Sequence, residues 1–252
     1  MSSESPRATP IAVVGVSALF PGSIDKTGFW SDILAGRDLI SDVPETHWLA
    51  EDYYDPDPTT ADHFHAARGG FLEDIDFAPM DFGMPPSLLE STDSAQLLAM
   101  VVAQKVLEDA AQGQFTDIDR ERMSVILGVA STTELVGDMC SRLQRPVMKR
   151  LLEQTGADDA IVDDFMQRFD DNFVEWNEAT FPGLLGNVVA GRVANRFDLG
   201  GTNMVVDAAC ASSLPATTRW RNAPPCWKPR CASWCTPAPP PRWSATVRSA
   251  RS

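Results

Sequence analysis

Short, unbroken runs of apolar residues recur along the first 206 positions of this chain. Residues 11–14, 124–130 and 203–206 each contain such a run, closed by glycine, small or charged residues. Runs of this length predict strands that are buried on both faces. Longer stretches with helical spacing lie between them, and this alternation predicts an α/β fold built on a parallel sheet.

The clearest helix is predicted over residues 91–111, with Thr92 or Asp93 as its N-terminal cap. Its apolar positions recur at helical spacing and predict a face that packs in the core. These positions are Leu97, Leu98, Val101, Val102, Val106 and Leu107.

The other stretches have less regular patterns. Residues 26–35 predict a short helix that ends at Gly36. Residues 41–82 are rich in aspartate, proline and aromatic residues and predict a long irregular surface excursion, a kind of segment that is usually functional or interface-forming. Residues 136–180 predict acidic helices, and residues 181–197 predict one helix punctuated by glycines, in which Arg192, Asn195 and Arg196 have structural roles.

From Pro215 onward the composition changes. Residues 215–252 hold eight of the 19 prolines, four of the seven tryptophans and seven basic residues, but no acidic residue. Such prolines prevent helices and strand ladders from continuing. We therefore predict a disordered N-terminus over residues 1–9, one domain over 10–214 and a disordered tail over 215–252. The composition of the tail is typical of out-of-frame translation of GC-rich DNA, and we hypothesise a frameshift after Leu214.

The charge and the cysteine content exclude several classes of protein. A net charge of −14 argues against nucleic-acid binding, which needs excess lysine and arginine. No apolar run reaches the roughly 18–20 residues that span a bilayer, and the first 16 residues lack the pattern of a signal peptide. Five cysteines, three of them in the tail, do not form a disulfide framework. We expect a cytoplasmic protein with reduced thiols that binds neither nucleic acid nor a membrane.

One cysteine lies where a reaction is expected. Cys210 follows the apolar run at 203–206 and lies within a series of small residues, which permit a sharp turn from a strand into a helix. Such a turn exposes the side chain at its apex, and the free N–H groups of the following helix would stabilise a thiolate. Most free cysteines are small buried hydrophobes instead. From these residues alone both roles stay open.

Two further groups could suggest metal binding. His63 and His65 alternate beside Asp62, but no completing ligand has recognisable spacing. We interpret them as loop histidines near an interface between domains or protomers. The three cysteines of the tail lack a fourth ligand and have proline-rich flanks, so we predict neither a metal site nor a bound cofactor.

Four segments of the sequence carry a family resemblance, in this order: IAVVGVSALFPGS near the N-terminus, the acidic excursion, NVVAGRVANRFDLGG, and VVDAACASSL around Cys210. From about Pro10 to Leu214 the chain resembles the N-terminal half of a β-ketoacyl synthase (ketosynthase) domain of the polyketide or polyunsaturated fatty acid synthase type. DAACASSL is a highly specific signature of that family.

The resemblance implies a thiolase-like α/β fold, present here as its N-terminal half and truncated after the nucleophile turn. It implies that Cys210 accepts an acyl chain from the phosphopantetheine of an acyl carrier protein, and that a decarboxylated malonyl thioester then condenses with it in fatty acid or polyketide biosynthesis. A thiolate is both a good nucleophile and a good leaving group, and the Cys210 N–H would form part of an oxyanion hole. The intact family forms homodimers through the strand at residues 203–206.

The sequence departs from this family after the cysteine. Ketosynthases use two later histidines to assist decarboxylation, whereas His47, His63 and His65 all precede Cys210. The hypotheses are therefore an acyltransferase of this family, or a catalytically silent fragment or interaction piece. A thiolase is a third, which the acidic excursion and DAACASSL disfavour. A half-sheet also buries little apolar area, so we predict poor solubility.

Overall fold

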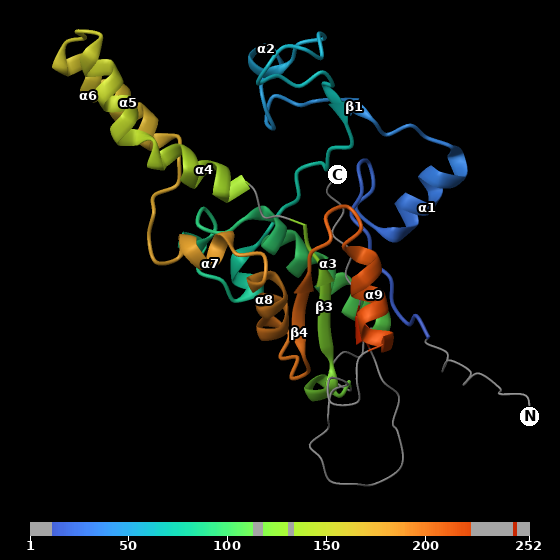
Figure 1. Ribbon diagram of the computed structural model, residues 1–252. Helices are drawn as coiled ribbons and strands as arrows, with labels where there is room; N and C mark the ends of the chain where they lie inside the picture. Colours follow the sequence, from blue (N-terminus) through green and yellow to red (C-terminus); the bar gives the residue numbers. More distant parts are fainter. Residues whose placement is uncertain (1–11, 113–117, 131–133, 223–243, 246–252) are drawn as a thin grey trace, which may run out of the picture.

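The computed structural model describes residues 12–112, 118–130, 134–222 and 244–245 (Figure 1). Its α-helices are α1 (Lys26–Ala35), α2 (Ala50–Tyr53), α3 (Ser94–Ala111), α4 (Glu134–Leu143), α5 (Arg145–Gln154), α6 (Asp159–Asp171), α7 (Thr180–Leu184), α8 (Val188–Arg196) and α9 (Ser213–Asn222). Its 3-10 helices are η1 (Pro79–Phe82), η2 (Pro86–Leu88) and η4 (Arg120–Arg122). Its strands are β1 (Ser41–Asp42), β2 (Arg68–Gly69), β3 (Ser124–Gly128), β4 (Asn203–Val206) and β5 (Ser244–Ala245).

The central sheet has the strand order β4-β3-β5, and both pairs are parallel. β3 pairs with β4 from Val125 opposite Asn203 to Gly128 opposite Val206. Parallel neighbours need a crossover connection, and the segment between these two strands contains α4 to α8. The predicted parallel sheet and the strand at 203–206 are confirmed, and the strand predicted over 124–130 is present but ends at Gly128.

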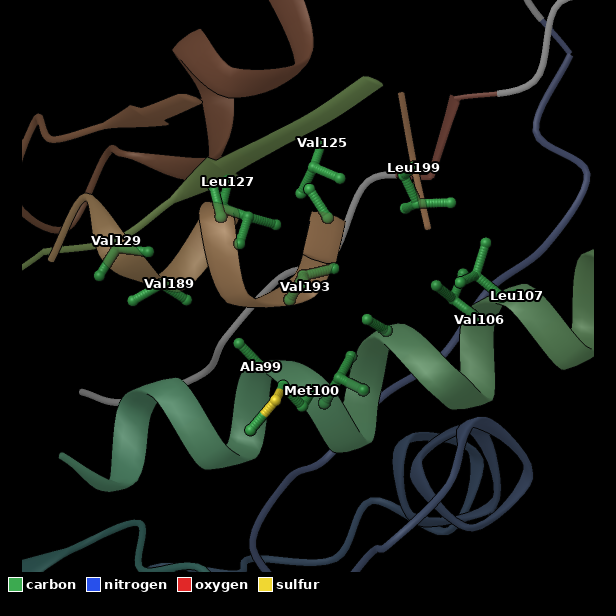
Figure 2. Packing of buried hydrophobic residues seen from close by; sticks show 14 of the residues in the cluster. Ala99, Met100, Val106, Leu107, Val125, Leu127, Val129, Val189, Val193 and Leu199 are labelled. Atoms are coloured by element: carbon green, nitrogen blue, oxygen red, sulfur yellow. The ribbon is translucent and has the colours of Figure 1, made fainter. Parts of the chain in front are cut away.

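The main core lies on one face of this sheet. Val125, Leu127 and Val129 alternate along β3 and its end, so they share a face, and all three are buried. Figure 2 shows α8 between this face and α3, with Val189 and Val193 among the buried side chains of the cluster. All six apolar positions predicted for the 91–111 helix belong to this core or pack against it, so that prediction is confirmed.

The second face of the sheet faces α9. Figure 1 shows α8 and α9 on either side of the β4–β3 pair. Gly128 and Ser212 meet closely on this side, because a Cβ on Gly128 would lie only 2.5 Å from the Ser212 carbonyl carbon. The strands are therefore covered by helices on both faces, as expected of a parallel sheet.

Capping side chains set the ends of two predicted helices. The Asp25 carboxylate accepts from the N–H groups of Thr27 and Gly28 and begins α1, while Gly36, at φ 62°, ends it. Asp93, rather than Thr92, begins α3, because its carboxylate accepts from the Ala95 N–H.

The acidic helices predicted over residues 136–180 are α4 to α6. The last of them ends at Asp171 rather than at residue 180. In Figure 1, α5 and α6 lie side by side and project from the rest of the protein. The excursion over residues 41–82 is largely irregular, as predicted. It contains one short antiparallel pair, Ser41 to Asp42 with Arg68 to Gly69.

The N-terminal strand expected at residues 11–14 is absent from the part of it that the structure describes. Residues 12–14 form no strand, and Val13 is 80% exposed. An extended segment becomes a strand only beside a partner, and no described residue pairs with it. The segment instead leads to α3, where the Val16 N–H donates to Asp109.

The single helix expected over residues 181–197 is also wrong. The chain forms α7 and α8, with a break at residues 185–187. The side-chain amide of Gln96 donates to the carbonyls of Pro182, Gly183 and Leu185. These carbonyls therefore have a partner outside their own helix, so the break leaves none of the three without a hydrogen bond.

Part of the predicted tail is helical. α9 continues through Pro215 to Asn222, so the boundary expected at Leu214 falls inside a helix. Proline is tolerated in the first turn of a helix, where its missing N–H would have had no partner. Residues 223–243 and 246–252, and the N-terminal segment predicted over 1–9, lie outside the described residues. No helix in the described part of the chain is long and apolar enough to cross a membrane.

Candidate active site

Cys210 lies in the connection from β4 to α9. β4 ends at Val206 and α9 begins at Ser213, so the predicted strand-to-helix turn is confirmed. The Cys210 side chain is exposed and carries a free thiol. An exposed cysteine does not fit the alternative of a small buried hydrophobe.

The turn around Cys210 is held by backbone and side-chain hydrogen bonds. The Ala211 N–H donates to the Ala208 carbonyl at 3.1 Å, and the Ser212 N–H donates to the Ala209 carbonyl at 3.0 Å. The Asp207 carboxylate accepts from the Ala209 N–H at 2.9 Å. These bonds fold the segment into a compact bend that directs the chain from the sheet edge into α9.

Ala209, directly before the cysteine, has a left-handed backbone with φ 49°. For a residue with a Cβ this conformation costs about 1–2 kcal/mol. Strain of this kind persists only where the surrounding structure imposes it, and it is concentrated at functional sites. Cys210, the next residue, is exposed.

The histidines lie apart from this turn in the sequence and belong to the 41–82 excursion. The His47 ring packs edge-on against Phe71 at 4.9 Å between centroids. His63 Nδ1 lies 2.8 Å from the Ala61 carbonyl oxygen. No group of three or more metal-ligating side chains occurs among the described residues, and the three tail cysteines lie outside them.

Gln96 on α3 and Arg192 on α8 form a polar contact between the two helices. Gln96 is fully buried, and its amide oxygen accepts from the Arg192 guanidinium. Desolvation by burial lowers the pKa of Arg192. Arg196 donates to the Asp81 carbonyl, so both arginines have partners within the chain, and their structural roles stay predictions. Gln96 itself was missed, because nothing in the sequence distinguishes it as the buried one among the polar residues of this helix.

A cavity of about 450 Å³ lies beside α1, away in sequence from the cysteine. Its lining includes Phe20, Phe29, Leu39 and the buried Asp32, whose carboxylate is paired with Arg37. None of the residues that line it belongs to the turn at 207–212, between β4 and α9. We therefore centre the candidate site on the turn.

The family of the chain follows from comparison with known proteins. The family model described as Beta-ketoacyl synthase, N-terminal domain, matches residues 8–223, which include the whole Cys210 turn. The chain therefore belongs to the β-ketoacyl synthase family. The resemblance predicted from the sequence is confirmed.

Individual relatives agree with this assignment. The chain is 36% identical over 208 residues to a polyunsaturated fatty acid synthase protein of a Thraustochytrium species, covering 82% of this chain and 7% of that protein. It is 30% identical over 211 residues to a phenolphthiocerol/phthiocerol polyketide synthase protein of Mycobacterium tuberculosis, covering 83% of this chain and 12% of the relative. The chain thus spans a small part of these large proteins.

A solved structure shows which part of the fold is present. An oxazolomycin ketosynthase domain from Streptomyces albus superposes with a TM-score of 0.58 at 26% identity. The match covers 84% of this chain and 32% of the solved one. The described residues are thus a mixed α/β fragment that corresponds to the N-terminal part of a thiolase-like ketosynthase.

Proposed function

We propose that Cys210 is the acyl-accepting nucleophile of a β-ketoacyl synthase active site. The observation that carries this proposal is the exposure of Cys210 at a strained strand-to-helix turn, inside the segment that matches the family. The substrates are acyl thioesters presented by an acyl carrier protein, and no other cofactor takes part.

The proposed step is a thioester exchange. The Cys210 thiol loses its proton, and its sulfur attacks the acyl carbonyl carbon. A new carbon–sulfur bond forms, the bond to the carrier sulfur breaks, and the carrier leaves as a thiol after taking up one proton. In this proposal the Cys210 N–H stabilises the oxyanion that forms in between.

Condensation with a malonyl unit needs more than this step. The two histidines that the family uses have no counterpart after Cys210 in this sequence. The second candidate function is therefore a catalytically silent piece of a ketosynthase, which folds the turn but carries out no condensation. The observation behind this candidate is that His47, His63 and His65 all precede the cysteine.

Dimerisation is proposed at β4. In the sheet order β4-β3-β5, β4 is an edge strand among the described residues, and a strand edge offers unpaired backbone groups to a partner. A second copy pairing along this edge would bring two Cys210 turns close to one interface.

The acyl-acceptor proposal is tested with cerulenin, an electrophile that mimics an acyl substrate. The full chain is incubated with cerulenin, digested and mapped by mass spectrometry. We expect an adduct at Cys210 and little at Cys140, a second exposed thiol on α4 that serves as an internal control. The variant Cys210→Ser should lose the main adduct, whereas Cys140→Ser should keep it. Equal labelling of all cysteines would instead favour the silent piece.

A further inference from the structure

Ser212 is a buried residue within an exposed turn. Its relative exposure is 4%, while Cys210 and Ala211 before it are exposed. A serine directly before a helix ordinarily turns its hydroxyl forward to cap the free N–H groups of that helix. Here both hydrogen bonds of the hydroxyl run backward into the Cys210 turn.

The two bonds span the strained residue. Ser212 Oγ donates to the Ala209 carbonyl at 2.5 Å and accepts from the Ala208 N–H at 2.9 Å. They thus tie together the residues on both sides of the Ala208–Ala209 peptide link. Because Ala209 has φ 49°, a conformation that an alanine avoids when free, these bonds oppose its return to an ordinary backbone.

The position of Ser212 is fixed in turn by the sheet. The end of β3 contacts its backbone closely, since a Cβ on Gly128 would lie 2.6 Å from the Ser212 carbonyl oxygen and 2.7 Å from the Ser213 nitrogen. The hydroxyl is therefore anchored to the central sheet. The sheet thus fixes the place of Ser212, and the Ser212 hydroxyl in turn fixes the conformation of the turn.

We propose that Ser212 is a positioning residue for Cys210. Its hydroxyl holds the turn in the conformation that presents both the thiol and the Cys210 backbone N–H to an acyl thioester. The inference rests on the proposed role of Cys210 as acyl acceptor. Ser212 touches no substrate and acts through the backbone of residues 208–210.

Two reactions at Cys210 distinguish a positioning role of Ser212 from a role in the stability of the fold alone. Acylation by the octanoyl thioester of N-acetylcysteamine passes through an oxyanion, which needs a correctly directed N–H. Alkylation by iodoacetamide displaces iodide and forms no oxyanion. Both rates are measured at Cys210 by peptide mapping of the full chain, with Tm recorded for each variant.

We expect Ser212→Ala to lower the acylation rate about tenfold or more and to leave alkylation within about twofold, because the thiol stays exposed. Ser212→Thr keeps the hydroxyl and should retain most of the acylation rate. Ser213→Ala, at the neighbouring serine, is the matched control and should leave both rates unchanged. A merely structural role would lower Tm without separating the two rates.

The outcomes distinguish the two proposals. If the unchanged chain is not acylated at Cys210, the proposed function fails. If it is acylated and Ser212→Ala is acylated equally fast, the role of Ser212 is overturned while the proposed function stands. Should Ser212→Ala not fold, Ser212→Cys replaces it, since a thiol keeps the size and a weak donor. A lowered acylation-to-alkylation ratio then supports the role of Ser212, and an unchanged ratio refutes it.

Discussion

Gln96 shows how one side chain can decide the path of a distant segment. Its Nε2 donates to three carbonyls of the chain around α7, and its Oε1 accepts from the guanidinium of Arg192 on α8. Both donor and acceptor capacities of the amide are thereby used within the core. The break between α7 and α8 and the half-buried charge of Arg192 therefore depend on the same residue.

Replacing Gln96 by leucine should lower the free energy of unfolding by about 2–3 kcal/mol, because carbonyls and a guanidinium lose their buried partner. Urea denaturation measures this change. Gln104→Leu is the control, since Gln104 is exposed on the same helix and its amide donates to Glu108, four residues on. A Gln96→Leu chain as stable as the Gln104→Leu chain would show that the contact between Gln96 and Arg192 does not support α8.

A substitution at Gly128 tests the contact between the sheet and the Cys210 turn. Gly128→Ala places a methyl group against the Ser212 backbone, and overpacking of this kind costs about 1–3 kcal/mol. Gly137→Ala on α4 meets nothing within 4 Å and should be neutral or stabilising by up to about 1 kcal/mol. Thermal unfolding of both variants checks the difference, and equal effects would contradict the close contact.

At the scale of residues, the sequence predicted where the candidate site lies but not the side chains whose hydrogen bonds hold the surrounding segments in place. The small residues around Cys210 predicted a turn but left open whether its thiol is exposed or buried, and the structure shows it exposed. The roles of Ser212 and Gln96 depend on which backbone groups lie within hydrogen-bond distance in the folded chain, and no periodicity encodes that. Whether Cys210 accepts an acyl group stays a prediction.

At the scale of elements, helices were predicted better than the strand at the N-terminus. Capping residues and helical spacing are local signals, so α1 and α3 follow from a few neighbouring residues. A strand needs a partner that is distant in sequence. The run at 11–14 had the correct composition, yet in the described residues it has no neighbour with which to pair.

An ion pair between Arg145 and Asp170, at 2.7 Å, joins α5 to α6. The hydrogen bond from Arg145 holds the pKa of Asp170 below its ordinary value. A lowered folded-state pKa adds stability above the unfolded pKa of about 3.9 and loses it as pH falls through the folded value. We therefore expect hydrogen exchange in α5 and α6, corrected for intrinsic rates, to accelerate as the pH falls below about 4.

Asp170→Asn should make exchange in the same helices fast already at neutral pH, and thus less dependent on pH. Asp171→Asn is the control, because Asp171 is exposed and its carboxylate accepts from the amide of Gln167 on its own helix. It should preserve both the slow exchange at neutral pH and the acceleration on acidification. Identical profiles for the two variants would exclude the Arg145–Asp170 pair as the cause.

At the scale of the whole molecule, large apolar side chains remain uncovered. Val13, Leu34, Leu143 and Met80 are each at least 67% exposed, and Trp30 is 59% exposed. Exposed apolar surface favours association, whereas a net charge of −14 opposes it through repulsion. Salt screens the repulsion between charges but not the apolar contacts. The predicted poor solubility should therefore worsen as the salt concentration rises.

We expect the chain to self-associate, and to do so more strongly as sodium chloride is raised from low to physiological concentration. Light scattering after size exclusion measures the mass at each concentration. On α1, Leu34→Lys removes one of the most exposed apolar side chains and should reduce association. Ser31→Lys adds the same charge at an exposed polar position of the same helix, so it corrects for the effect of net charge. A monodisperse sample with one sharp thermal transition at all salt concentrations would contradict the prediction, and equal masses for the two lysine variants would remove α1 from the associating surface.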